Sequence, residues 1–372
     1  MVLRDISLIG FKNISDGRLA LSDGINCFVG DNGAGKTNLL DAVHCLSMAK
    51  SMLTMTDSQS VRHGDEFFVL DGCFVADDGR QEQVCCSYSR RSGKTLKRNG
   101  KEYERLSDHV GAFPIVVVSP ADSALISDSA DERRRYLNSF ISQIDKGYLT
   151  ALIRYNAALA ERNKLLKTQP EQAMIEIYDR LLCQSGEPIH TRRQEIIDQM
   201  KPLVENYYAL LCEERETIGI EYRSELSERP LSELLEASLQ RDLANRFTTC
   251  GIHRDDMVLS IGGYPLRKYG SQGQQKSFLI ALKLAQYTIL SDRKCERPIL
   301  LLDDLFDKLD MHRVAQLLSI VAGEKFGQIF ITDCNKVRLQ STLDRMPMYS
   351  MWLSSRNSPV RSATRSPTIS RQ

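Results

Sequence analysis

The pattern of hydrophobic and polar residues changes twice along the chain. Up to residue 118, short β-type runs alternate with turn dipeptides and predict strands at residues 3–9, 25–29, 67–74 and 84–88. Asn99-Gly100 lies between two short polar runs and predicts a hairpin turn. The first third of the chain is therefore expected to be rich in β-structure.

A helical pattern takes over from about residue 129. Ser129, with Glu132 three residues later, has the form of a capping box at a helix start. Helical periodicity continues through residues 174–215 and 231–246, with one strand-like interruption at 218–222. One apolar helical face is predicted to comprise Leu149, Leu152, Ile153, Ala157 and Ala160.

Strand-like runs return at residues 257–261, 299–302 and 329–332. A β-rich start, a helical middle and an α/β end predict an α/β protein with an inserted, mainly helical arm domain. We expect an N-terminal lobe at 1–125, the arm at 126–245, a C-terminal lobe at 246–352 and a disordered Ser/Arg-rich tail at 353–372.

The composition is that of an ordinary globular protein, with 42% hydrophobic and 26% charged residues. No apolar run approaches the roughly 18 residues of a membrane span and no secretory signal is seen, so we expect a cytoplasmic protein without a membrane partner. The ten cysteines form no C-x-x-C pair, which favours reduced thiols over metal ligands. The net charge is only +1, so any nucleic-acid binding requires a local basic patch.

Residues 30–37 read G-D-N-G-A-G-K-T and fit the phosphate loop G-x-x-x-x-G-K-[ST], between a predicted strand and a predicted helix. The glycines let successive N–H groups face phosphate oxygens, Lys36 supplies a charge, and Thr37 offers a hydroxyl to Mg²⁺. The chain is therefore predicted to bind ATP and Mg²⁺. The expected ATP-binding residues are Gly30, Asp31, Asn32, Gly33, Ala34, Gly35, Lys36, Thr37 and Asn38.

Two adjacent acids follow the apolar run P-I-L-L-L at 298–302. Beside a phosphate loop, such a strand end is the expected place for the metal ligand. We assign Asp303 to Mg²⁺, together with Thr37, and Asp304 to the polarisation of an attacking water, which makes it the candidate catalytic residue.

A second Gly/Ser/Gln loop, G-S-Q-G-Q-Q-K-S at 270–277, opens an apolar helix and is also suited to phosphate. One subunit has little use for two such loops, whereas a dimer that encloses ATP between two subunits uses both. We expect D-K-L-D at 307–310, with Asp307 and Asp310, to be a subunit-interface strip. The residues expected to reach ATP from the other subunit are Ser271, Gln272, Gly273 and Gln274.

The order of these motifs resembles that of ABC-type ATPase heads, with G-S-Q-G-Q where transporters usually have L-S-G-G-Q. Within that superfamily the chain resembles the RecF family of bacterial recombination mediators over nearly its whole length. Beyond the phosphate loop, S-Q-G-Q-Q and the two acids, the resemblance rests on F-K-N at 11–13, A-K-S at 49–51, N-G-K at 99–101, S-P-x-D at 119–122, S-x-x-E-R-R-x-Y-L at 129–137, Y-x-x-x-L-x-x-R-N-x-L-L at 155–166 and G-x-H-R-D-D at 251–256.

The resemblance implies an ABC-type ATPase head whose ATP-dependent homodimer clamps double-stranded DNA near single-strand gaps. It also implies slow, DNA-dependent ATP hydrolysis and RecO and RecR as partners. Family members often have G-P-H and Q-R-N where this chain has Gly251-Ile252-His253 and Glu161-Arg162-Asn163, and the second departure is one that can alter arm packing. Transporter heads place a histidine after the strand that follows the two acids, where this chain has Ile331-Thr332-Asp333, so the γ-phosphate sensor is left open.

The run at 89–101 holds six basic residues and no acid. Two interpretations stay open: a hairpin that contacts the DNA backbone, or a solvated hairpin whose lysines prevent edge pairing. For Arg133, Arg134 and Arg135, ion pairs within the protein are favoured over contacts with phosphate. The candidate DNA-binding residues are Arg90, Arg91, Lys94, Lys97, Arg98 and Lys101.

Three other functions compete with a DNA-binding ATP switch. A transporter motor usually has its signature loop nearer the phosphate loop. A P-loop phosphotransferase leaves G-S-Q-G-Q unexplained. An SMC-like structural ATPase needs a long coiled coil, and no heptad pattern persists in the helical middle.

Overall fold

The computed structural model describes residues 1–168, 171–212, 216–304, 310–334, 349–355 and 358–363. The chain divides into two compact units. The first comprises Met1–Ala121 and Gln286–Gln372, and the second comprises Asp122–Ala285. Helix α8 (Gln272–Lys294) begins in the second unit and ends in the first. No helix in the described ranges has the length and apolar character that crossing a membrane requires.

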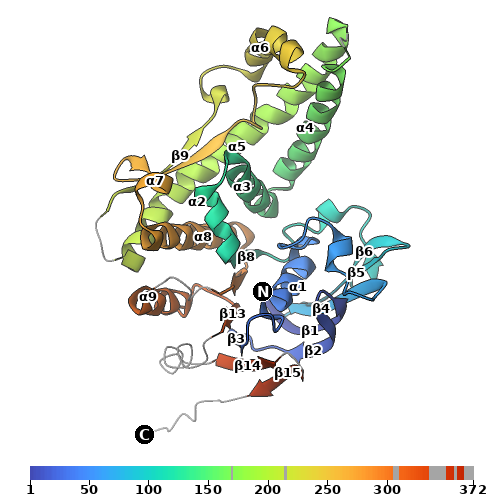
Figure 1. Cartoon of the computed structure of the whole chain (residues 1–372), viewed down its shortest axis with the longest axis vertical. Coiled ribbons are helices and arrows are strands. Elements are labelled where there is room, and N and C mark those ends of the chain that lie inside the picture. Colours follow the sequence, from blue (N-terminus) through green and yellow to red (C-terminus); the bar gives the residue numbers. More distant parts are fainter. Residues whose placement is uncertain (169–170, 213–215, 305–309, 335–348, 356–357, 364–372) are drawn as a thin grey trace. The chain divides into compact units, whose positions relative to one another are not determined.

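The first unit contains a largely parallel sheet that carries the predicted phosphate loop (Figure 1). The order across the sheet is β15 (Ser358–Ala363), β14 (Tyr349–Ser355), β3 (Ile25–Gly30), β13 (Ile329–Asp333), β12 (Ile299–Leu302) and β8 (Ile115–Val118). Four of its strands, β3, β8, β12 and β13, are nearly continuous apolar runs, as expected where a sheet is buried on both faces. β3 pairs in parallel with β13 and with β14, while β12 pairs in parallel with β13 and with β8.

An antiparallel sheet forms the other layer of this unit, and helix α1 (Lys36–Met48) contacts strands of both sheets. Asn99 and Gly100 both have positive φ, 52° and 79°, between β6 and β7, so the predicted hairpin turn is confirmed. The first unit also holds α9 (Met311–Val321) and the short 3₁₀ turns Asp57–Ser60 and Leu106–Asp108. The strand order is β2 (Ile14–Ala20), β1 (Val2–Phe11), β4 (Phe67–Val75), β5 (Gln81–Ser89), β6 (Gly93–Arg98) and β7 (Lys101–Glu102).

The second unit is mainly helical. The long helices α4 and α5 lie side by side, and α6 packs on α5 (Figure 1). β10 pairs with both β9 and β11 in a small antiparallel sheet. Besides the start of α8, its elements are two 3₁₀ turns, Pro120–Ser123 at its border and Glu225–Ser227, with α2 (Ala124–Ser127), α3 (Ala130–Ile144), α4 (Lys146–Leu165), α5 (Gln172–Cys212), β9 (Ile218–Arg223), α6 (Leu231–Asn245), β10 (Asp256–Ile261), β11 (Tyr264–Pro265) and α7 (Leu266–Tyr269).

The domain boundaries differ from those expected from sequence. Residues 246–285 were assigned to a C-terminal lobe, but they belong to the helical unit. The physical reason is pairing that the sequence does not reveal: β10 pairs with β9 along its whole length. Part of the tail expected to be disordered is also ordered, because β14 runs to Ser355 and pairs with β15. Residues 356–357 and 364–372 lie outside the described residues.

The start and the buried face of the helical region differ from prediction too. α3 begins after Ser129, but the capping box does not form, because the Glu132 carboxylate pairs with Arg135. The face of α4 predicted to be apolar is partly solvent-facing, with Ile153 51% exposed. The buried face of α4 instead includes Tyr155 and Arg162, because both form hydrogen bonds with polar groups inside the unit.

Candidate nucleotide site

The loop between β3 and α1 has the backbone that phosphate binding requires. Gly33 and Gly35 adopt left-handed conformations, with φ of 82° and 95°. A Cβ on Gly35 would lie 2.9 Å from Oδ1 of Asn13, so a side chain there would displace the Asn13 amide. The loop leads directly into the N-terminus of α1, whose dipole favours an anion.

Side chains from outside the loop hold it in place. Asn13 donates from Nδ2 to the carbonyl oxygen of Gly33 at 3.2 Å, and its Oδ1 accepts from Nδ2 of Asn38 at 2.8 Å. Beside it, Lys12 pairs with the fully buried Asp41, which also accepts from the hydroxyl of Ser51 at 2.7 Å. The F-K-N and A-K-S motifs therefore support the loop. Asn13 is a residue of this site that no sequence pattern had placed beside the phosphate loop.

Lys36 lies inside the loop. Its Nζ donates to the carbonyl oxygens of Gly30 at 2.7 Å and of Asp31 at 2.9 Å. Within the loop, the N–H of Ala34 donates to the Asp31 carbonyl oxygen at 3.1 Å. An ammonium held by two carbonyl oxygens can exchange them for phosphate oxygens with little movement of the chain.

The two predicted acids lie at the end of β12. The hydroxyl of Thr37, at the start of α1, donates to Oδ1 of Asp303 at 2.9 Å, and the Thr332 hydroxyl donates to the same oxygen at 2.7 Å. Asp303 is 4% exposed. Its burial raises the pKa of the carboxyl group, and the two hydroxyl donors oppose this rise. Oδ1 of Asp303 therefore links the end of β12 to the helix start that follows the phosphate loop.

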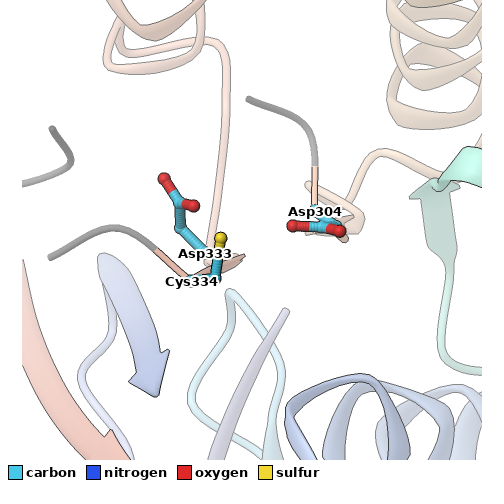
Figure 2. A group of neighbouring side chains, drawn as sticks. All are labelled: Asp304, Asp333 and Cys334. Carbon is cyan, nitrogen blue, oxygen red and sulfur yellow. The ribbon is translucent and has the colours of Figure 1, made fainter. Parts of the chain in front are cut away.

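Asp304 lies next to a second acid from the neighbouring strand (Figure 2). It has a φ of 44°, in the left-handed region that few residues other than glycine adopt. Ligand atoms of Asp304, Asp333 and Cys334 lie within 4.8 Å of one another, with Asp333 buried and Cys334 exposed. Asp333 lies in the segment where transporter heads have a histidine, and the sequence assigned no γ-phosphate sensor to that segment.

The second Gly/Ser/Gln loop lies in the helical unit and has a capping box. The Ser271 N–H donates to Oε1 of Gln274 at 2.6 Å, and the Gln274 N–H donates to the Ser271 hydroxyl at 3.3 Å. Nε2 of Gln274 also donates to Oε1 of Glu216 at 2.6 Å, and the Tyr208 hydroxyl donates to the other Glu216 oxygen at 2.9 Å. Gln272 and Gly273 lie in the first turn of α8.

Comparison with known proteins identifies the family. The family described as RecF/RecN/SMC N terminal domain matches residues 2–351. The chain belongs to the RecF family. The DNA replication and repair protein RecF of Bacteroides thetaiotaomicron is 46% identical over 93% of this chain and 94% of its own length. RecF of Flavobacterium johnsoniae is 42% identical over 92% of this chain and 96% of its own.

Solved structures agree with this assignment. The structure of the recombination mediator protein RecF-ATPrS in the RecFOR pathway is 30% identical, with a TM-score of 0.87, over 97% of this chain and 98% of its own. The SMC head bound to the C-winged helix domain of ScpA has a TM-score of 0.59 at 14% identity, over 99% of this chain and 98% of its own, and supports the fold alone. The predicted ABC-type ATPase head is therefore confirmed.

Of the interface strip expected for this RecF-family chain, Asp307 lies outside the described residues. Asp310 caps α9: its Oδ1 accepts from the N–H of Arg313 at 2.9 Å, and its Oδ2 lies 3.5 Å from Nε of Arg313. These contacts lower the pKa of Asp310. The local contacts therefore give Asp310 a structural role, and its role at a subunit interface stays a prediction.

The six basic candidates for DNA contact divide into two groups. Lys94 pairs with Asp57, and Arg98 makes a two-pronged pair with Glu82, with N–O distances of 2.9 and 2.6 Å. The Arg98 contact lowers the pKa of Glu82. The other four are exposed and form no ion pair with any described residue: Arg90, Arg91, Lys97 and Lys101.

Arg133, Arg134 and Arg135 each form an ion pair within the protein, as the sequence favoured. Arg133 makes a two-pronged pair with Asp256, with N–O distances of 2.7 and 3.0 Å. Arg193, 1% exposed, pairs with Asp255 at 2.8 Å. His253 is held by the Tyr155 hydroxyl at 2.9 Å and the Thr248 carbonyl oxygen at 3.1 Å, and burial lowers its pKa to about 4.

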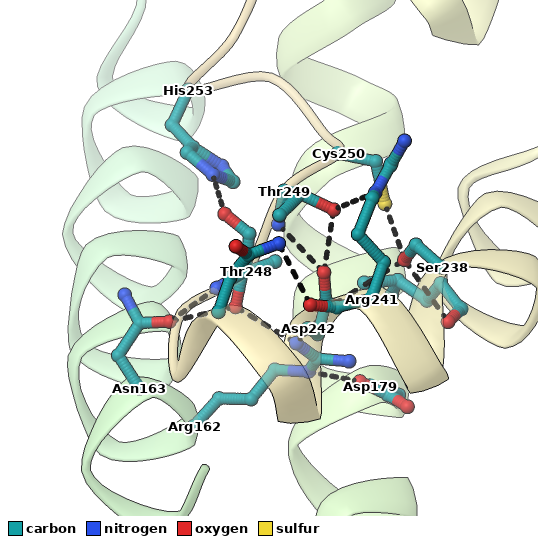
Figure 3. Close-up of polar contacts among 12 residues, drawn as sticks. Arg162, Asn163, Asp179, Ser238, Arg241, Asp242, Thr248, Thr249, Cys250 and His253 are labelled. Atoms are coloured by element: carbon teal, nitrogen blue, oxygen red, sulfur yellow. Dashed lines mark hydrogen bonds and ion pairs between the residues drawn. The ribbon is translucent and has the colours of Figure 1, made fainter. Parts of the chain in front are cut away.

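A second polar network lies between α4, α5 and α6 (Figure 3). Arg162, fully buried, donates to Asp242 at 2.7 Å, to Thr248 at 2.8 Å and to Asp179 at 2.6 Å. Glu161, by contrast, is exposed and pairs with Lys164. Position 161 therefore lies outside the buried network.

Proposed function

We propose that the chain is an ATP-dependent DNA clamp of recombinational repair whose homodimer closes on two enclosed ATP molecules. The observation that carries the proposal is the joint placement of Thr37 and Asp303 behind the phosphate loop. A second Gly/Ser/Gln loop suited to phosphate opens α8 in the helical unit. One subunit needs only one such loop for its own ATP, so the second is available to the ATP of a partner subunit.

The residues behind the loop fit Mg²⁺. Magnesium prefers oxygen ligands, and Thr37 and Asp303 supply a hydroxyl and a carboxylate from two different elements. Oδ2 of Asp303 accepts no hydrogen bond from any described residue, so one oxygen is left for a cation. When bound, Mg²⁺ would neutralise charge on the β- and γ-phosphates.

The residues of the site would then have separate roles in ATP binding and hydrolysis. The loop N–H groups and Lys36 bind the phosphates, and Asp304 orients a water toward the γ-phosphate and accepts its proton. Ser271 and the N-terminus of α8 approach the γ-phosphate from the other subunit. Hydrolysis removes the group that both subunits hold, so the dimer opens.

The same proposal includes binding of the clamp to double-stranded DNA near a single-strand gap and its action together with RecO and RecR. They are supported by RecF relatives described as DNA replication and repair proteins and by the RecF structure in the RecFOR pathway. The four exposed basic residues between the end of β5 and β7 are the candidates for phosphate contact. Hydrolysis that is slow and stimulated by DNA would make ATP a timer.

Sedimentation of the wild type and of Ser271→Arg, with and without Mg-ATP, tests the in-trans site. We expect the wild type to dimerise with ATP, and Ser271→Arg to bind ATP but stay monomeric. Ser232→Arg is the matched control, because it adds the same side chain at an exposed position of the same unit. If Ser271→Arg also lost ATP binding, the loop would act within its own subunit.

Binding of a gapped duplex at two salt concentrations tests the DNA part. An ATP-dependent complex that weakens as salt rises supports the clamp. A monomer that binds ATP and ignores DNA would favour a P-loop phosphotransferase.

A further inference from the structure

The hydroxyl of Thr332 contacts both acids of the candidate site. Its Oγ1 donates to Oδ1 of Asp303 at 2.7 Å and accepts from the backbone N–H of Asp304 at 2.9 Å. A threonine hydroxyl has one donor and two acceptor positions, so it can make both bonds at once. Thr332 is fully buried in β13, the strand next to β12, so no water competes for these bonds.

Asp304 needs such a restraint more than most residues. Its φ of 44° lies in the left-handed region, which aspartate tolerates better than most residues but less well than glycine. Such conformations persist where the surrounding structure fixes them. The N–H that Thr332 accepts belongs to Asp304 itself, so this bond sets the direction in which the Asp304 side chain leaves the backbone.

We propose that Thr332 is the positioning residue of the hydrolytic site, which fixes Asp304 through its backbone and Asp303 through its carboxylate. The inference rests on the proposed roles of Asp303 and Asp304 in ATP hydrolysis. Thr37 holds the same Asp303 oxygen from the phosphate-loop side. Thr332 therefore couples the metal ligand to the water-orienting acid, while Thr37 couples the metal ligand to the nucleotide.

Thr332→Val tests the inference, because valine has nearly the shape of threonine, is favoured in strands and lacks the hydroxyl. Thr332→Ser keeps the hydroxyl and loses only a methyl group. We expect Thr332→Val to lower kcat roughly 10- to 100-fold, the loss that a misplaced catalytic group causes. We expect its ATP affinity to stay close to wild type, because Lys36 and the loop glycines are unchanged.

Two further measurements need no assay of released phosphate. The ATP-bound dimer of Thr332→Val should form and should dissociate more slowly than that of the wild type, as observed by sedimentation. Melting without nucleotide establishes whether Thr332→Val is folded; if it is not, Thr332→Ala, which also lacks the hydroxyl, takes its place in the same measurements. Thr332→Ser should recover most of kcat.

The outcomes separate this inference from the proposed function. A folded Thr332→Val with wild-type kcat overturns it, as does an equal loss in Thr332→Ser, which would mean that methyl packing matters. Asp304→Asn is measured alongside. If Asp304→Asn hydrolyses ATP like the wild type, the assignment of Asp304 fails, and the inference fails with it. If only Asp304→Asn loses turnover, the inference alone is wrong.

Discussion

Removal of the Asp242 carboxylate should destabilise the helical unit more than any surface change. Asp242 is fully buried, and its Oδ2 accepts from Arg162 at 2.7 Å. Its Oδ1 accepts from the N–H of Thr249 at 2.9 Å and from the Thr249 hydroxyl at 2.6 Å. Asp242→Ala therefore removes one of the two acids that pair with the buried Arg162 guanidinium. It also removes the hydrogen bonds that hold the loop at Thr249 to α6.

The expected magnitude follows from what remains. Loss of one partner of a buried ion pair costs about 3–5 kcal/mol. Asp179 stays 2.6 Å from Nε of Arg162 and is 23% exposed, so part of the charge is still balanced and the cost should fall near about 3 kcal/mol. For a unit of this size that corresponds to a fall in melting temperature of roughly 6–12 °C.

Hydrogen exchange on the full chain measures this change within the helical unit. A loss of about 3 kcal/mol should speed exchange of the core amides of α4 and α6 roughly 100- to 200-fold. Glu161→Ala is the matched control, because Glu161 precedes Arg162 on the same helix and forms only an exposed pair with Lys164. The control should change the unfolding free energy by less than about 0.5 kcal/mol. If Asp242→Ala exchanged no faster than Glu161→Ala, the network would contribute nothing to stability.

Three other predictions follow from the first unit. His109 is fully buried and burial lowers its pKa to about 4, so the unfolded chain binds the proton first as pH falls. The unfolding free energy should therefore drop by up to about 3 kcal/mol between pH 6.5 and pH 4, and His109→Phe should flatten that slope in urea titrations. Asp304→Asn should hold the ATP-bound dimer closed, and a dissociation rate equal to that of the wild type would contradict its role. Replacement of the four exposed basic residues by alanine should lower the salt dependence of DNA binding by about 0.9 per lost phosphate contact, whereas Lys94→Ala and Arg98→Ala should mainly lower stability.

The sequence predicted those parts of the fold that depend on local chemistry. The hairpin turn at Asn99-Gly100 and the strand–loop–helix around Lys36 need particular residues at adjacent positions. The motif also indicated Thr37 and Asp303, although they are far apart in the chain, because one nucleotide needs both. Their hydrogen bond at 2.9 Å confirms that these two residues meet.

The parts that the sequence missed depend on contacts between distant segments. Hydrophobic periodicity placed Ile153 inside and gave no reason to bury Arg162, whose partners lie on α5 and α6. Thr332 looked like an ordinary strand residue, and its role depends on β12 lying next to β13. The end of the arm was misplaced for the same reason, because the pairing of β9 with β10 is invisible to local patterns.

The RecF-like motifs have two different physical roles, and this decides which of them bear on ATP. Lys12, Asn13 and Ser51 fix the surroundings of the phosphate loop. The motif at 251–256 of the helical unit, by contrast, builds its interior: Asp255 pairs with the buried Arg193, and Asp256 pairs with Arg133. Changes in the second group should therefore lower the stability of the helical unit and leave ATP affinity intact, whereas Asn13→Ala should weaken ATP binding in a chain that melts normally.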